Sequence, residues 1–216
     1  MQDISKIEKT INYTFKNKEL LLTALSHTSY SNENDVESYQ RLEFLGDSIL
    51  GFIVAKKLFD AYPDKDEGVL SKMRASIVCE ESLSEFARQV GLKVFIKLGV
   101  GEEKSNGREK SSILSDVFEA VLGAVYLDSD FNTAKEWLDD IITDDCYLNF
   151  TYSDFKTMLQ EKYKNKTVEY HTSDNGNNSK AQFLSKVYID GKVYGSGVGT
   201  TKKSAEQAAA KTALNR

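Results

Sequence analysis

The stretch Gln40-Arg41-Leu42-Glu43-Phe44-Leu45-Gly46-Asp47-Ser48-Ile49-Leu50 decides how this chain folds. It opens an apolar run that continues to Ala55, and its apolar residues recur at the period of a helix, which predicts a buried face. The residues of this predicted core face are Leu42, Leu45, Ile49, Phe52 and Ile53. Glycine costs a helix interior about 1 kcal/mol relative to alanine. We therefore expect another backbone to pack closely at Gly46 and Gly51.

Two acids of this helix, Glu43 and Asp47, are four residues apart and leave it on the same side. Like charges at that spacing repel by roughly 0.2–0.5 kcal/mol, and desolvation in an apolar setting costs more. A second helix, predicted over 111–127, is apolar nearly all round, which is typical of a buried helix. Before Asp128 its only charges are Asp116 and Glu119, three residues apart. A helix-start role explains Asp116 but not Glu119, which lies deeper in the apolar run.

Four acids on two core helices predict a site for a hard cation. Ligands that are all oxygen select Mg²⁺, with Mn²⁺ as a substitute. The chain has two histidines and two cysteines, Cys79 and Cys146, so a zinc site is not expected. Glu67, in a charged turn, is either an ordinary helix-start acid or a further site residue. His27 is interpreted as a hydrogen-bonded histidine near a helix end.

Composition places the chain among globular proteins. It has 216 residues, 40% of them hydrophobic, and two cysteines are too few for a disulfide framework. No run of about 18 uncharged apolar residues predicts a membrane helix, and the start of the chain lacks a signal-peptide pattern. A reduced cytoplasmic protein with no membrane partner is expected. The net charge is −5, but residues 151–216 carry +5 and residues 1–150 carry −10. A basic tail on an acidic body suggests nucleic acid as the partner of the tail.

The order of predicted elements indicates two domains. Residues 3–60 read as helices, separated by a polar loop over 31–38. Further helices are predicted over 69–79, 81–90, 111–127 and 133–142, and 102–110 reads as a charged loop. The tail reads as a helix over 154–163, a strand from 168, a loop over 173–180, strands over 182–189 and 192–198, and a helix over 200–214. Asp190-Gly191 is a strong signal for a two-residue hairpin. We expect a mainly α domain over 1–145, a linker over 146–152, and a small α+β domain of order α-β-β-β-α over 153–216.

Four segments, in order, resemble motifs of ribonuclease III. They are Ala24-Leu25-Ser26-His27-Thr28-Ser29, Arg41-Leu42-Glu43-Phe44-Leu45-Gly46-Asp47-Ser48, Glu67-Gly68-Val69-Leu70-Ser71 and Ser115-Asp116-Val117-Phe118-Glu119-Ala120. Residues 154–214 resemble the double-stranded RNA-binding domain that follows in bacterial-type members. The resemblance covers nearly the whole chain, and its octapeptide is highly specific.

The resemblance implies an endonuclease that hydrolyses double-stranded RNA to 5′-phosphate and 3′-hydroxyl ends, in the processing of rRNA and mRNA precursors and in decay. By matched position, Glu43, Asp47, Asp116 and Glu119 would hold the metals, whose general chemistry is to activate water and clamp the reacting oxygens. Glu67 resembles an accessory acid. Family members work as homodimers with one centre in each subunit. Phe44 would then lie in the dimer contact, and its alternative is an ordinary core aromatic.

The resemblance also assigns RNA-binding residues in the tail. Thr157, Gln160 and Glu161 would read 2′-hydroxyls in the minor groove, and Lys202 and Lys203 would grip phosphates from a helix N-terminus. A pair of lysines at a helix start is usually just solvated. Here it opposes the helix dipole, which favours an anionic partner.

Two positions depart from the family pattern. Gln40 stands where the family usually has a glutamate, so the rate, the metal affinity or the choice of cleavage site is expected to differ. The groove-entering loop lacks the usual proline and histidine after its glycine. Asn177, Ser179 and Lys180 can still hydrogen-bond there, with weaker or less selective binding expected.

Two other classes of function compete with a nuclease. A non-cleaving protein that binds double-stranded RNA would need none of the four acids, so their presence together disfavours it. A helical domain that serves only as a dimerisation scaffold leaves the acids unexplained.

Overall fold

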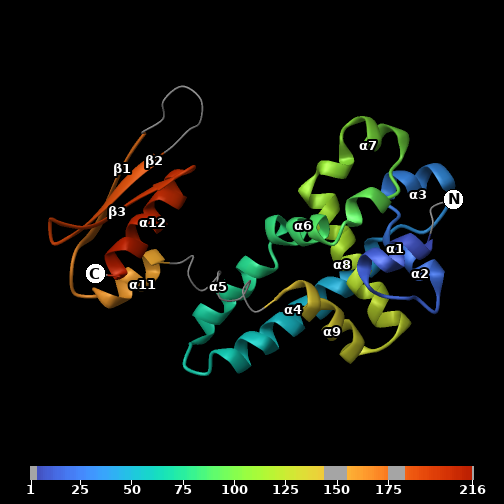
Figure 1. Ribbon diagram of the computed structural model, residues 1–216, viewed down its shortest axis with the longest axis horizontal. Helices are drawn as coiled ribbons and strands as arrows, with labels where there is room; N and C mark the ends of the chain where they lie inside the picture. The colour runs from blue at the N-terminus through green and yellow to red at the C-terminus, as the bar shows by residue number, and fades with distance from the viewer. Residues whose placement is uncertain (1–3, 144–154, 175–182, 216) are drawn as a thin grey trace. The chain divides into compact units, whose positions relative to one another are not determined.

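The computed structural model describes residues 4–143, 155–174 and 183–215 (Figure 1). Contacts within the chain divide it into two compact units, Met1–Tyr147 and Leu148–Arg216. The predicted linker over 146–152 lies outside the described residues, and the predicted domain boundaries stay predictions. No helix in the described ranges is long and apolar enough to cross a membrane.

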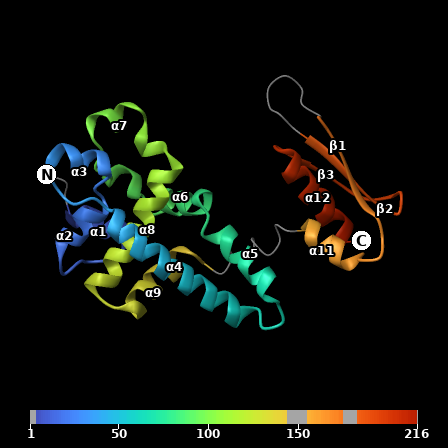
Figure 2. The same cartoon turned by 180° about the vertical axis from the view of Figure 1, so that it is seen from behind.

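The first unit is built of helices, which confirms the predicted mainly α domain. Its α-helices are α1 (Ile4–Ile11), α2 (Lys18–Ala24), α3 (Thr28–Asn34), α4 (Gln40–Ala61), α5 (Glu67–Ile77), α6 (Glu80–Gln89), α7 (Val100–Lys104), α8 (Ser111–Asp128) and α9 (Phe131–Ile141). Short 3-10 turns cover Leu92–Phe95 and Gly107–Glu109. Helix α8 packs against α2, α4, α6 and α9, and it lies in the middle of the unit in both views (Figures 1 and 2).

Helix α8 is central because it is apolar nearly all round. Its side chains Leu114, Val117, Phe118 and Val121 are fully buried. Phe118 lies beside Phe86 of α6 and Trp137 of α9, with ring centroids 6.1 Å and 5.6 Å away. Burial of each such large side chain contributes about 1.5–3 kcal/mol to stability.

Two glycines bring α4 and α8 into backbone contact. A Cβ added to Gly46 would lie 1.9 Å from the carbonyl oxygen of Glu119, and one added to Gly123 would lie 2.4 Å from the carbonyl oxygen of Leu42. The expectation of close packing is therefore confirmed at Gly46. It is wrong at Gly51, where an added Cβ would meet open space.

Three details of the first unit differ from the sequence prediction. Helix α3 occupies part of the predicted loop over 31–38, because the ring Nδ1 of His27 accepts a hydrogen bond from Ser29 N at 3.1 Å and caps it. Helix α7 occupies the start of the predicted charged loop, with Val100 N bonded to the Glu33 carboxylate at 3.0 Å. Phe52, predicted to lie in the core, is 60% exposed.

The second unit has the predicted α-β-β-β-α order. Its elements are α11 (Phe155–Lys162), β1 (Val168–Asp174), β2 (Phe183–Ile189), β3 (Lys192–Gly199) and α12 (Lys202–Leu214). The strands form an antiparallel sheet of order β1-β2-β3. At the predicted hairpin, Asp190 and Gly191 have φ values of 49° and 77°, and a two-residue loop with two positive φ angles matches the twist of the strands.

Alternate glycines of β3 let α12 lie directly on the sheet. A Cβ at Gly195 or Gly197 would come within 2.4 Å or 2.3 Å of the Ala209 backbone. The facing helix is lined by small side chains, and Ala205, Ala209 and Ala213 are fully buried. The core of this unit therefore forms by close backbone approach, completed by large side chains from α11 and β2: Phe155, Leu159, Val187 and Ile189.

Candidate active site

The four predicted acids come from the contact between α4 and α8. Glu43 and Asp47 are on α4, and Gly46 lies between them in the sequence. Because Gly46 has no side chain, the backbone of Glu119 on α8 lies directly against it. Glu119 therefore enters beside the acids of α4, and Asp116 lies almost one turn before it on the same helix.

The carboxylates act on one another across this contact. Burial raises the pKa of Glu119 to about 8, with the negative charges of Asp47, Glu43 and Asp116 adding to the effect. Burial also raises the pKa of Glu43, reinforced by Asp116 and Asp47. Glu43 and Glu119 are half-buried, while Asp47 is exposed. The structure thus brings all four acids into one electrostatic cluster, open to solvent on the Asp47 side.

Asp116 differs because it has a hydrogen-bond donor. The Tyr39 hydroxyl donates to Asp116 Oδ2 at 3.0 Å. Burial raises the pKa of Asp116, and both this hydrogen bond and the nearby His27 ring oppose the rise. Burial and the Asp116 charge raise the pKa of the Tyr39 phenol, so it stays protonated as a donor. Sequence analysis did not identify Tyr39, whose role depends on a contact with a residue 77 positions away.

The chemistry of this cluster fits a hard cation. Its donors are carboxylate oxygens, which Mg²⁺ and Mn²⁺ accept. Burial raises the pKa values of Glu43, Asp116 and Glu119, and the neighbouring carboxylates add to the rise at Glu43 and Glu119. A bound cation would favour the ionised carboxylates. Within the described ranges, no three His, Cys, Asp or Glu side chains are already grouped to hold a metal ion. Binding would therefore need Glu43, Asp47 or Glu119 to change rotamer on a fixed helix pair, while the Tyr39 hydrogen bond holds Asp116.

The two predicted accessory residues lie in different places. Gln40 begins α4, is exposed, and accepts a hydrogen bond at 3.4 Å from Ser38 Oγ. Glu67 begins α5 and accepts a hydrogen bond from Ser71 Oγ at 2.7 Å. It lines a pocket of about 380 Å³ whose lining includes Phe59 and Arg74 but none of the four acids. This position matches the helix-start interpretation of Glu67, and a role in the site stays a prediction.

Helix α4 has an apolar surface that faces away from α8. Phe44, Phe52 and Phe59 are 77%, 60% and 67% exposed, and they recur at intervals of eight and seven residues, about two turns each. We call these three residues the outer α4 face. The exposure of Phe44 excludes the alternative of a core aromatic. Sequence analysis assigned Phe52 to the core and missed Phe59, although their spacing relative to Phe44 was a usable signal.

Predicted RNA-binding residues gather on α11 of the second unit. Thr157, Gln160 and Glu161 line one pocket of about 360 Å³. Lys164 and Lys166 line the same pocket and were not identified from the sequence, although the alternating lysines after the helix were visible there.

Other predicted RNA-binding residues lie at the start of α12. Lys202 and Lys203 are exposed in its first turn, which is fixed by a capping box between Thr201 and Ser204. Asn177, Ser179 and Lys180 lie outside the described residues.

A polar network joins α11 to α12 beneath the sheet. Lys156 Nζ pairs with Glu206 Oε2 at 2.5 Å, and Lys156 N donates to Gln207 Oε1 at 3.1 Å. Thr172 Oγ1 on β1 donates to Glu206 Oε1 at 3.3 Å. These contacts fix the first turn of α11 against the first half of α12, the two helices that carry Thr157, Gln160, Glu161, Lys202 and Lys203.

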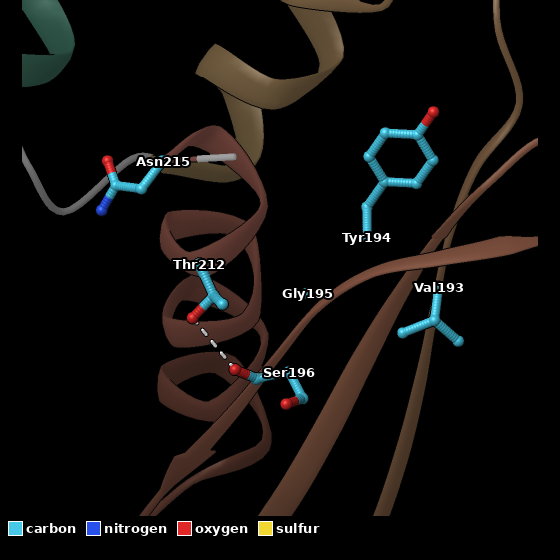
Figure 3. A pocket seen from close by; sticks show the side chains of 6 residues that line it. All are labelled: Val193, Tyr194, Gly195, Ser196, Thr212 and Asn215. Atoms are coloured by element: carbon cyan, nitrogen blue, oxygen red, sulfur yellow. Dashed lines mark hydrogen bonds between the residues drawn. The ribbon is translucent and has the colours of Figure 1, made fainter.

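A larger pocket of about 550 Å³ lies between β3 and the end of α12 (Figure 3). Its lining residues are Val193, Tyr194, Gly195, Ser196, Thr212 and Asn215. The Thr212 hydroxyl donates to Ser196 O at 3.0 Å, and the lining has no carboxylate, imidazole, amine or thiol. This pocket contains none of the predicted site residues.

Comparisons with known proteins match both units. A family model described as ribonuclease-III-like matches residues 17–146, and the model of the double-stranded RNA binding motif matches residues 155–216. The chain is 42% identical over 223 residues to a protein named Ribonuclease 3 from Aliarcobacter butzleri. It is 40% identical over 225 residues to Ribonuclease 3 from Listeria monocytogenes. Each alignment covers 100% of this chain and 98% of the relative.

Among solved structures, the first unit resembles the nuclease domain of ribonuclease III from Campylobacter jejuni. One such structure has a TM-score of 0.62 and 41% identity, covering 65% of this chain and 96% of that one. Its description concerns structural flexibility in a region involved in dimer formation of that domain. A second structure of the same domain gives a TM-score of 0.61 and 42% identity.

Proposed function

The chain belongs to the ribonuclease III family, and from this premise we propose that it is a Mg²⁺-dependent endoribonuclease that cuts double-stranded RNA. The observation that carries the metal dependence is the cluster of four acids on α4 and α8, in which the pKa of Glu119 rises to about 8. The proposed products are 5′-phosphate and 3′-hydroxyl ends. The proposed substrates are precursors of rRNA and mRNA, processed in the cytoplasm.

Glu43, Asp47, Asp116 and Glu119 are the residues that would hold the cation. When bound, Mg²⁺ supplies Lewis acidity, which lowers the pKa of a water molecule and offsets negative charge at the phosphate. Mn²⁺ is expected to substitute. Glu119 would have to be ionised to hold the cation, since a coordinating carboxylate is deprotonated. The close contact between α4 and α8 holds the backbones of all four residues in place, which limits the reorganisation that cation binding requires.

The second unit is proposed to hold the RNA duplex by its shape. Gln160 and Glu161 are exposed on α11 and can hydrogen-bond 2′-hydroxyls in the minor groove. Lys202 and Lys203 are exposed at the N-terminus of α12, where backbone N–H groups also favour a phosphate. The net charge of +5 over 151–216 adds attraction that does not depend on sequence.

We further propose a homodimer that forms through the outer α4 face. Three phenylalanines more than half exposed on one helix make an apolar patch of the kind that marks protein contacts. Gly51 lies on the same helix with open space around it, so a partner could approach the backbone there. Phe44 is assigned to this contact.

The substitution Glu119→Gln tests the proposed function. It removes an ionisable ligand, keeps the size of the side chain, and touches no group proposed to grip RNA. We expect cleavage of a labelled duplex to fall at least a hundredfold, while the dissociation constant for the duplex stays unchanged in a gel-shift titration. Glu81→Gln, at an exposed acid on α6, is the matched control and should cut like the wild type. Cleavage by Glu119→Gln at the wild-type rate would mean that the acids do not hold the cation.

The competing proposal is a protein that binds double-stranded RNA without cutting it. The raised pKa of Glu119 disfavours it, because a binder gains nothing from four carboxylates that repel one another. Duplex binding by the wild type without cleavage at any Mg²⁺ concentration would favour it.

A further inference from the structure

Tyr39 connects the two helices that carry the four acids. It is the residue before α4, its side chain is 3% exposed, and its hydroxyl donates to Asp116 Oδ2 on α8 at 3.0 Å. The bond joins a neutral donor to one oxygen of the carboxylate and leaves the other oxygen available to a further partner.

The backbone of Tyr39 is held as firmly as its side chain. Tyr39 N donates to Ser26 O at 2.9 Å, and Tyr39 O accepts from both Leu42 N and Glu43 N at 2.9 Å. Tyr39 therefore anchors the first turn of α4, including the backbone of Glu43, and its side chain reaches Asp116 on α8.

The ring of Tyr39 has little freedom to swing away. Its centroid lies 5.7 Å from that of His27, and the His27 ring is in turn fixed by Ser29, whose backbone N–H donates to Nδ1 at 3.1 Å. The Tyr39 hydroxyl is thus held at the N-terminus of α4 by backbone hydrogen bonds and by the His27 ring, and it sets the orientation of the Asp116 carboxylate.

We propose that Tyr39 is a positioning residue that holds Asp116 in the rotamer needed to bind the cation, an inference that rests on the proposed function of the acid cluster. It acts through Asp116 and does not itself contact metal or RNA. Without the hydroxyl, the Asp116 carboxylate rotates freely, and ordering it upon binding lowers the affinity for the cation. Partners that orient metal ligands typically change metal affinity by about 10–100-fold when they are removed.

The chain provides a matched control for the loss of such a bond. The Tyr13 hydroxyl donates to Asp128 Oδ2 at 2.9 Å, near the other end of the same helix α8. Asp128 also accepts from Lys16 N at 2.8 Å and from Asn17 N at 2.7 Å. Tyr13→Phe and Tyr39→Phe thus each remove one tyrosine–aspartate hydrogen bond from α8, and only Tyr39→Phe touches the acid cluster.

The experiment measures Mn²⁺ binding to the full chain without RNA, from the electron paramagnetic resonance signal of the free ion. Tyr39→Phe should raise the dissociation constant about tenfold or more, and Tyr13→Phe should leave it unchanged. In duplex cleavage, Tyr39→Phe should raise the Mg²⁺ concentration for half-maximal rate by a similar factor, with the rate at saturating Mg²⁺ close to wild type. In an Asp116→Asn background, Tyr39→Phe should add no further loss of Mn²⁺ affinity.

A purely structural role for Tyr39 gives a different result. The melting temperature would fall, as it would in Tyr13→Phe, while the Mn²⁺ dissociation constant stayed within twofold of the wild-type value. That outcome, or an equal loss of affinity in both variants, would overturn the proposal. The wild type in the same cleavage titration tests the nuclease function separately. If it never cuts the duplex, the proposed function fails, and the Mn²⁺ comparison still decides the role of Tyr39.

Discussion

At the scale of single residues, burial and the charges of neighbouring acids both change the pKa of Glu119. Burial and three neighbouring carboxylates raise its pKa from 4.5 to about 8. Between these two pH values the folded protein keeps a proton that the unfolded chain releases. Stability from this group is therefore present below about pH 4.5 and is lost progressively as the pH rises to about 8.

This linkage predicts the pH dependence of the metal-free protein. With a chelator present, the melting temperature of the wild type should fall relative to that of Glu119→Gln as the pH rises from about 5 to about 8.5, because glutamine never acquires the charge. Thermal unfolding followed by circular dichroism at several pH values measures the difference. Parallel curves for the two proteins would show that Glu119 has an ordinary pKa. A divalent cation should reduce the difference, since it compensates the charge.

At the scale of elements, the close contact between α4 and α8 determines where the four acids lie. Gly46→Ala would place a Cβ 1.9 Å from the Glu119 carbonyl oxygen, and because the neighbour is backbone, the helices must separate. We expect a loss of about 1–3 kcal/mol or more in the free energy of unfolding, measured by urea denaturation. Gly101→Ala is the control, because an added Cβ there meets open space. Equal midpoints for the two variants would contradict the close contact.

The start of α12 is the element proposed to meet phosphates. Replacing Lys202 and Lys203 by alanine should weaken binding about equally across duplex sequences, because phosphate contacts carry no sequence information. The slope of log affinity against log salt should become shallower by about one for each lysine. Filter binding over a range of salt concentrations measures this slope. Lys192→Ala, at the exposed β2–β3 hairpin, should leave the slope unchanged. If the double variant also keeps the wild-type slope, these lysines do not contact phosphate.

Local signals explain which elements the sequence predicted correctly. The Asp190-Gly191 hairpin was predictable because its turn chemistry is contained in two residues. Helix α3 was missed because its residues are polar and its ends depend on His27 and on a contact between Glu33 and Val100, 67 positions away. Phe52 was misplaced because a long helix with apolar residues on two sides does not reveal which side faces the core.

In the candidate site, too, local features were predictable from the sequence and contacts between distant residues were not. Helical spacing was enough to pair Glu43 with Asp47 and Asp116 with Glu119. Their meeting across two helices depends on Gly46 facing a backbone while Gly51 faces open space, and the sequence treats these two glycines alike. The donor to Asp116 was not predictable either, since nothing in the sequence near Tyr39 indicates a partner on α8.

At the scale of the whole molecule, the outer α4 face predicts how the protein assembles. Phe44→Asp places a charge in an apolar patch and should shift the protein from dimer to monomer at micromolar concentration. Sedimentation velocity measures the change. Val94→Asp, at a similarly exposed apolar residue outside α4, is the control and should leave the dimer intact. Dimers of unchanged stability in Phe44→Asp would show that assembly uses another surface.

The distribution of charge between the two parts of the chain matches their proposed functions. The acidic first 150 residues contain the carboxylates that would hold cations, and the basic tail contains the groups that would hold RNA. Unless cations occupy the acid cluster, its negative charge repels RNA, which is a polyanion. RNA binding by the second unit should therefore depend less on divalent ions than cleavage by the first unit does.

The most direct test of the nuclease function is cleavage of a labelled RNA duplex, resolved on a gel, with Mg²⁺ or with Ca²⁺, beside the same RNA as a single strand. Calcium is the control because it occupies oxygen sites with looser geometry. We expect discrete cuts in the duplex with Mg²⁺ and no cuts with Ca²⁺ or in the single strand. Duplex binding in both ions with cutting in neither would contradict the assignment and leave a protein that binds double-stranded RNA without cleaving it.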